Sequence, residues 1–191
     1  MAKVFNTFAI LTGLGLILSG CQSLDTSRLK QIKETEQTKS NALIFCEGTE
    51  NCEFERLGQV RIVDENNHRV DKQAIQQGIV RLQKASVKEP NAIYLSVPAA
   101  QHELVVRFYP ISQDKAETLH LIHRFKASQR YQLKMYRKRS SSKGSLLTVS
   151  APDPLCVDLQ QNSKTIRRFC KPYNVLNGLG EFVEQKNFKP R

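Results

Sequence analysis

Residues 93–109, which read IYLSVPAAQHELVVRFY, decide the fold class of this chain. An apolar residue stands at every second position from Ile93 to Val97, and the same period of two returns from Leu104 to Phe108. A period of two is typical of a β-strand that buries one face. The stretch therefore predicts two strands joined by a turn at Pro98.

Short apolar or alternating runs continue on both sides of this stretch. They predict further strands over residues 42–46, 59–63, 119–125, 131–135 and 146–149, and residues 156–170 read as a β-hairpin. Seven or more short strands at this density favour an antiparallel domain. We expect a mainly β fold, a small antiparallel β-sandwich or barrel-like domain with one possible short helix, stapled by disulfides.

Residues 71–84 contain the helical period of the chain. Ile75, Ile79 and Leu82 are spaced by four and three residues, and Asp71 is a residue type that caps helices at the amino end. Gly78 lies inside the segment and disfavours a helix there. The segment is interpreted as a helix capped by Asp71.

Length and composition are those of one small globular domain. The chain has 191 residues, of which 40% are hydrophobic, so global disorder is excluded. Its formal net charge is +11, and residues 1–20 hold one lysine and no acid, which leaves 11 − 1 = +10 for the remainder. Such a charge favours anionic partners, although many basic proteins use it only for solubility.

The amino terminus has the features of an export signal. Lys3 precedes an uncharged apolar run over residues 8–18, which is too short to span a bilayer comfortably. The run ends in Leu18-Ser-Gly-Cys21, which resembles the lipobox of bacterial lipoproteins. The resemblance implies a signal peptide over 1–20 and attachment of diacylglycerol to the thiol of Cys21. An ordinary cleaved signal with a chance cysteine, or an uncleaved anchor, are the alternatives.

This resemblance also implies a location. In such lipoproteins an Asp after the lipidated Cys often implies retention in the inner membrane, and here the residue is Gln22. We therefore expect an exported protein that is lipid-anchored to the outer membrane and faces the periplasm. A lipoprotein carries several acyl chains, which makes the anchor effectively permanent.

Composition divides the rest of the chain into three parts. Residues 21–40 are polar and predict a lipidated amino terminus and flexible tether, which could extend to about 60 Å. Residues 41–176 form the predicted disulfide-stapled β domain, and residues 177–191 a loose carboxyl-terminal tail. Within the domain, residues 97–108 resemble the turn and strand of PEGA-type envelope β domains, although Ala100 replaces the usual Gly. That resemblance implies a small non-catalytic β-sandwich.

Four cysteines remain after Cys21, namely Cys46, Cys52, Cys156 and Cys170. An even number in an exported chain predicts two disulfides, with three possible connectivities. We favour Cys46–Cys52, which closes a tight loop, and Cys156–Cys170, which lie opposite each other about the midpoint of the predicted hairpin. A thiol-based metal site is the rival interpretation, but the spacings are not those of a zinc ribbon.

No motif for catalysis or for a cofactor is found, so we expect a non-enzymatic protein with no metal and no cofactor. The chain has no G-x-S-x-G, H-E-x-x-H or phosphate-binding loop. Of the four histidines, His120 and His123 would point to opposite faces of a strand, and His102 lies in the predicted turn. These histidines, with His68, are interpreted as surface or edge residues. Ser140 and Lys143 lie in a Ser-rich loop.

Two basic clusters are the candidate anion-binding residues. They comprise Lys134, Arg137, Lys138, Arg139 and Lys143 in the first, and Lys164, Arg167, Arg168 and Lys171 in the second. Tyr131, Tyr136 and Tyr173 lie among them. Conversely, Glu47, Glu50, Glu53 and Glu55 predict an acidic loop around the first cysteine pair. If the two clusters lie at one end of the domain, they would form a joined basic face.

The function expected from these features is that of a non-enzymatic outer-membrane lipoprotein, acting as a periplasm-facing interaction or accessory module of the cell envelope. The alternative is a binder of envelope polyanions through the basic face, such as lipopolysaccharide phosphates, anionic lipid or an acidic glycan. An enzyme acting on envelope polymers is less favoured. An envelope protein is an expected partner, and nucleic acid is not.

Overall fold

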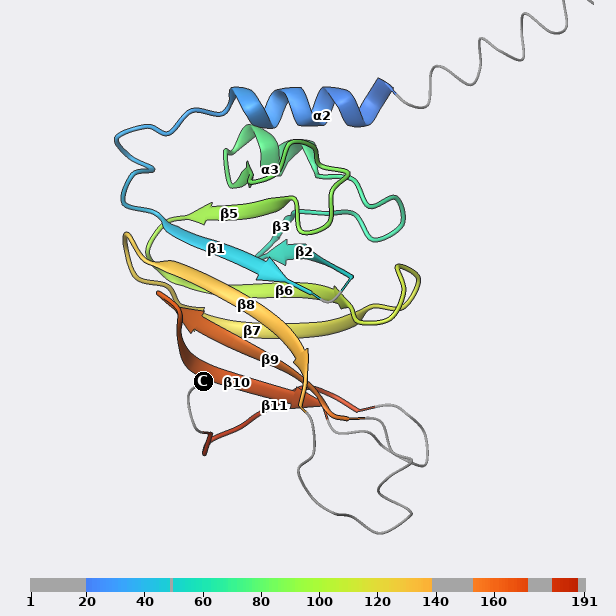
Figure 1. The fold of residues 1–191 in the computed structure, drawn as a ribbon. Coiled ribbons are helices and arrows are strands. Elements are labelled where there is room, and N and C mark those ends of the chain that lie inside the picture. The colour runs from blue at the N-terminus through green and yellow to red at the C-terminus, as the bar shows by residue number, and fades with distance from the viewer. Residues whose placement is uncertain (1–19, 49, 139–152, 172–179, 189–191) are drawn as a thin grey trace, which may run out of the picture.

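Two β-sheets face each other across one apolar core (Figure 1). The structure is a computed structural model, and it describes residues 20–48, 50–138, 153–171 and 180–188, with side chains from residue 24 onward. The mainly β, sandwich-like fold is confirmed. The strand predicted over 146–149 lies outside the described residues.

The larger sheet has seven strands in the order β11-β10-β9-β8-β1-β5-β4. Their bounds are β1 Ala42–Glu47, β4 Val80–Leu82, β5 Ile93–Val97, β8 Arg130–Arg137, β9 Leu155–Gln161, β10 Lys164–Lys171 and β11 Val183–Glu184. The pair of β1 and β8 is parallel, and the other pairs are antiparallel. The sheet is therefore mixed rather than purely antiparallel.

The smaller sheet has four antiparallel strands in the order β3-β2-β6-β7. Their bounds are β2 Asn51–Leu57, β3 Val60–Arg61, β6 Gln101–Tyr109 and β7 Glu117–Arg124. The turn at Pro98 carries the chain from β5 in the larger sheet to β6 in the smaller one. His102 Nε2 lies 2.9 Å from the Pro98 carbonyl oxygen, to which it donates, and so holds that turn.

The predicted helix is much shorter than its period suggests. Helix α3 covers only Lys72–Gln76, and the Asp71 side chain caps it by accepting from Gln73 N at 2.7 Å. The cap is confirmed, but the helical prediction beyond the first turns is wrong. Gly78 adopts a left-handed φ of 66°, which turns the chain out of the helix and into β4.

The amino-terminal tether prediction is also wrong in part. Residues Gly20–Gln31 form helix α2, which lies across α3 in Figure 1. Leu29 is buried in the core, and Asp25 is buried beside Arg69, at 3.1 Å. Helix α2 has few apolar residues, but the buried Leu29 and the ion pair of Asp25 with Arg69 hold it against the rest of the domain.

The predicted tail contains ordered structure as well. Strand β11 pairs with β10, and both guanidinium nitrogens Nε and NH2 of Arg167 bond the Glu184 carboxylate, at 2.7 and 2.6 Å. The interpretation of residues 183–184 as a loose tail is therefore wrong. Strand β11 is too short to bury many apolar side chains. The bidentate ion pair helps to hold it against β10 instead.

Both predicted disulfides are confirmed. Cys46 bonds Cys52, and Cys156 bonds Cys170, with Cα–Cα distances of 6.1 and 4.1 Å. Cys156 and Cys170 are direct partners across β9 and β10, as the hairpin midpoint predicts. Asn162 and Ser163 form the turn with positive φ angles, a conformation that two-residue hairpins favour.

Candidate functional site

Most of the described cations in the two predicted basic clusters have a carboxylate partner. Of the seven described members, four have a carboxylate partner within ion-pair distance, and Arg139, Lys143 and Tyr173 lie outside the described residues. The pairs are Lys134–Glu47, Arg167–Glu184, Arg168–Asp158 and Lys171–Glu117. The prediction that this set faces solvent is wrong for Arg168, which is buried.

Two of the tyrosines among these cations lie in the described residues. Tyr131 is fully buried, and its hydroxyl accepts from Lys126 N at 2.9 Å. Tyr136 is half-buried and donates to Asp158 at 3.1 Å, inside the buried pair with Arg168. The ring of Tyr131 is therefore closed to a stacking ligand.

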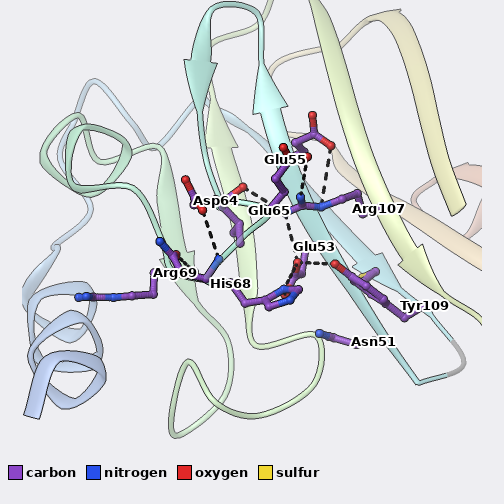
Figure 2. Close-up of polar contacts among 12 residues, drawn as sticks. Asn51, Glu53, Glu55, Asp64, Glu65, His68, Arg69, Arg107 and Tyr109 are labelled. Carbon is purple, nitrogen blue, oxygen red and sulfur yellow. Dashed lines mark hydrogen bonds and ion pairs between the residues drawn. The ribbon is translucent and has the colours of Figure 1, made fainter. Parts of the chain in front are cut away.

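A different polar cluster forms on the outward face of the smaller sheet (Figure 2). Glu53 on β2 lies opposite Arg107 on β6, and the Arg107 side chain is only 5% exposed. Arg107 NH2 donates to Glu53 at 3.3 Å and to the Val63 carbonyl at 3.1 Å. Glu55 and Glu65 each lie 3.8 Å from the same guanidinium, so three carboxylates surround one cation.

This cluster corrects the predicted acidic loop. Glu53 and Glu55 lie on strand β2, where they alternate with Cys52 and Phe54, whose side chains face the core. Apolar and acidic residues alternate over residues 52–55, as expected for a strand, but the high content of acids led to the prediction of a loop. Arg107 stands on the predicted strand, where it gave no signal of its own.

Glu53 is the centre of the cluster. Its side chain is 13% exposed, and it accepts from Tyr109 Oη at 2.9 Å. His68 Nδ1 lies 3.1 Å from both carboxylate oxygens. Since a carboxylate only accepts, Nδ1 carries the proton. Burial, and then the charge of Glu53, raise the pKa of Tyr109 far above its ordinary value, so the phenol remains a donor.

His68 comes from the loop between Ile62 and Asp71. Asp64 holds this loop by accepting from the backbone N–H groups of Asn66 and Asn67, at 3.0 and 3.2 Å. His68 itself has a positive φ of 53°. Its side chain is at the surface, as predicted, but its bond to a carboxylate fifteen residues earlier has no signature in the sequence.

A cavity of about 340 Å³ opens beside this cluster. It is lined by Asn51, Glu53, His68, Val87, Lys88, Glu89, Tyr109 and Gln113. Asn51 links two of its walls, because Asn51 Oδ1 accepts from Asn91 N while Asn91 Oδ1 accepts from Cys52 N, both at 2.8 Å. The Cys46–Cys52 disulfide thus fixes one side of the cavity.

Helix α2 holds the other two walls. Asp25 pairs with Arg69, next to His68, and Thr26 Oγ1 accepts from Val87 N at 3.4 Å. Two neighbouring residues of one helix therefore connect the loop that carries His68 to the loop that carries Val87. The cavity is assembled against the amino-terminal helix.

The chemistry of the cavity suits binding. Glu53 and its donors could orient an imidazole, but no serine, threonine or cysteine is among the residues that line the cavity. No group of three metal-ligating side chains occurs in the described part of the chain. His120 and His123 do lie on opposite faces of β7, with only His120 exposed.

None of the helices within the described ranges is long and apolar enough to cross a membrane. No family model, curated protein or solved structure matches this chain.

Proposed function

We propose that this chain is an exported lipoprotein, anchored through Cys21 to the outer membrane, whose β domain is a non-enzymatic, periplasm-facing interaction module. The observation that carries the proposal is the sequence Leu18-Ser-Gly-Cys21 after an uncharged apolar run. Small residues before Cys21 suit cleavage there, and the thiol is the nucleophile that takes up lipid.

Two structural features support export and anchoring. The domain holds two disulfides, which persist in oxidising compartments outside the cytosol. Helix α2 contains Cys21, and Leu29 in the same helix is in the core. Eight residues of helix rise about 12 Å, so an anchored domain would rest close to the membrane rather than at the end of a long tether.

Replacing the lipid-bearing thiol tests the proposal. In cells labelled with palmitate, Cys21→Ser should lose the label, accumulate as the unprocessed precursor, and no longer fractionate with the outer membrane. The matched control is Ser23→Ala, which leaves residues 18–21 intact and should behave as the unchanged protein. A Cys21→Ser protein that is processed and membrane-bound like the control would refute the anchor.

Anionic lipid is a second candidate partner, through residues other than those predicted. Exposed cations gather on α2, on α3 and in the loops that follow α2 and β4, beside the proposed anchor: Arg28, Lys30, Lys33, Lys72, Lys84 and Lys88. Of this set, named here the α2 face, only Arg28 lies within 4 Å of a carboxylate among the described residues. Each cation near an anionic surface can contribute about 1 kcal/mol.

Vesicle binding separates this candidate from the predicted basic face. Changing Lys30, Lys33, Lys72 and Lys84 to Gln should weaken binding to phosphatidylglycerol vesicles and flatten its dependence on salt. The control changes Arg137, Lys138 and Lys164 to Gln, on the opposite side of the domain. Equal losses in both variants would refute an orienting role for the α2 face.

A further inference from the structure

We propose that the cavity beside Glu53 binds a small ligand that carries a primary ammonium group. The proposal concerns the module's ligand and does not require the lipid anchor, so either can fail without the other. It rests on the size of the cavity, on the hydrogen-bonding groups that face it, on the local balance of charge and on the bracing of its walls.

The size and lining suit a small polar molecule. A volume of about 340 Å³ lies within the range of ligand sites, roughly 300–1,000 Å³. Val87 is the one aliphatic side chain of the eight residues that line it, so an apolar ligand would find little complementary surface. Asn51, His68 and Tyr109 surround the approach to Glu53 in Figure 2.

The lining of the cavity includes hydrogen-bond acceptors that suit an ammonium group. His68 uses Nδ1–H toward Glu53, so in the neutral form of the ring Nε2 is the acceptor. Tyr109 donates its hydroxyl proton to Glu53 and so keeps that carboxylate turned toward the cavity wall. Glu89 accepts from Ser86 N through Oε1 alone, and that bond leaves Oε2 to a ligand. A ligand that donates several hydrogen bonds from one atom, as –NH₃⁺ does, is complementary to this set.

The local charge also favours a cation. Glu53 and Glu89 line the cavity against one cation, Lys88. Behind Glu53, Arg107 is shared with Glu55 and Glu65, so the cluster has more carboxylates than guanidinium groups. Arg69, near the cavity, is paired with Asp25. The negative excess attracts an ammonium ion, and Lys88 repels it.

The walls are held before any ligand binds. The ion pair of Asp25 and Arg69 and the bond from Val87 N to Thr26 fix two loops to α2, and the Cys46–Cys52 disulfide fixes a third side. A preorganised site spends little free energy on ordering its own groups, so even a small ligand can be retained.

The test is a titration of the purified full-length protein, in non-ionic detergent, with ethanolamine at pH 7. Two-dimensional NMR of the backbone amides reports saturation at residues 88–89 and 113. The matched neutral probe is ethylene glycol, which differs in lacking the ammonium group. We expect saturable binding of ethanolamine, with a Kd on the order of millimolar for so small a molecule, and no saturation with ethylene glycol.

Substitutions at two adjacent residues should change the affinity for ethanolamine in opposite directions. Glu89→Gln should weaken ethanolamine binding about tenfold, since it replaces a charge-assisted hydrogen bond. Lys88→Gln should tighten binding about two- to fivefold, because it removes a like charge. Lys164→Gln, at the distant β9–β10 hairpin, is the control and should change nothing.

All four proteins are first compared by thermal unfolding, and because residues 88, 89 and 164 are exposed, the fold should persist in each. Saturation by ethanolamine alone, with the opposite effects of the two variants, supports the proposal. Equal response to ethylene glycol, no saturation by ethanolamine at 100-fold above the expected Kd, or indifference to Glu89→Gln would overturn it.

Discussion

Two arginine–carboxylate clusters lie on the outward faces of the two sheets, one closed and the other open. On the larger sheet, Arg168 meets Asp158 through two bonds of 2.6 and 2.8 Å, and both side chains are at most 8% exposed. The hydroxyl groups of Tyr136 and Thr165 donate further hydrogen bonds to the Asp158 carboxylate. The ring of Phe188 lies 5.0 Å from the Arg168 guanidinium.

On the smaller sheet, Arg107 is equally buried but is less fully matched. Three carboxylates surround it, and its Nε has no hydrogen-bond partner among the described residues. Glu53 opens on the cavity instead of being covered. A fully matched, covered pair serves the fold, whereas the pair with excess charge beside the cavity is the one at which we propose binding.

The largest expected effect comes from breaking the closed pair. Arg168→Leu leaves Asp158 buried without its counter-charge, so the free energy of unfolding should fall by about 3–5 kcal/mol. Arg107→Leu should cost less, about 1–3 kcal/mol, because its carboxylates can turn toward water. Urea unfolding measures both, with the exposed Arg137→Leu as control. A cost for Arg107→Leu as large as for Arg168→Leu would contradict the distinction.

The disulfides sharpen the same comparison, since Cys156–Cys170 lies within the larger sheet and Cys46–Cys52 joins β1 of the larger sheet to β2 of the smaller one. Replacing Cys156 and Cys170 by Ala together should lower stability by about 3 kcal/mol, and replacing Cys46 and Cys52 by about 2 kcal/mol, because the second loop is shorter. The second variant should also weaken ethanolamine binding, which the first should not. Thermal unfolding and the NMR titration report the two effects, and the reverse order of binding losses would count against the cavity's bracing.

A smaller effect is expected where α2 meets the cavity. Asp25→Asn removes the charge that holds Arg69, at an expected cost of about 1–2 kcal/mol. Hydrogen exchange should become faster at the Val87 amide and across residues 63–70. Glu36→Gln, in an exposed pair with Lys39, is the control. Unchanged exchange at Val87 in Asp25→Asn would show that α2 does not brace this wall.

The smallest effect depends on pH. Burial, and then Arg167, lower the pKa of His123 below its ordinary value of 6.5, while Glu184 opposes them and Lys126 adds to them. The unfolded chain therefore binds more protons as pH falls below 6.5, so the folded state loses stability. His123→Gln should reduce that loss between pH 7 and 5, so the stability of the variant should depend less steeply on pH. The control is the exposed His120→Gln, and parallel stability curves for His123→Gln and the unchanged protein would sink this assignment.

Local sequence patterns predicted the strands and the disulfides, because both depend on residues that are close to each other in the sequence. The alternation over 93–109 became β5 and β6, and the midpoint of 156–170 placed Cys156 opposite Cys170. Alternation reports which face is buried, and a hairpin fixes its own register. The prediction failed where a single residue ended an element, as Gly78 ended α3.

Long-range contacts account for what the sequence did not reveal. Helix α2 has little apolar surface, and its position depends on partners such as Arg69, 44 residues away from Asp25. The candidate site likewise joins β2, β6 and the loops around His68 and Glu89, which come from separate parts of the sequence. The ion pairs of the predicted basic clusters were hidden for the same reason, since Glu47, Glu117 and Glu184 come from strands that are distant in the sequence.

The proposed anchor is tested most directly by the intact mass of the protein extracted from outer membranes. We expect a chain that begins at Cys21, with the two disulfides formed and with the added mass of a diacylglycerol and its acyl chains on Cys21. A chain that still begins at Met1, or one that begins at another residue or carries an unmodified Cys21, would contradict the proposal.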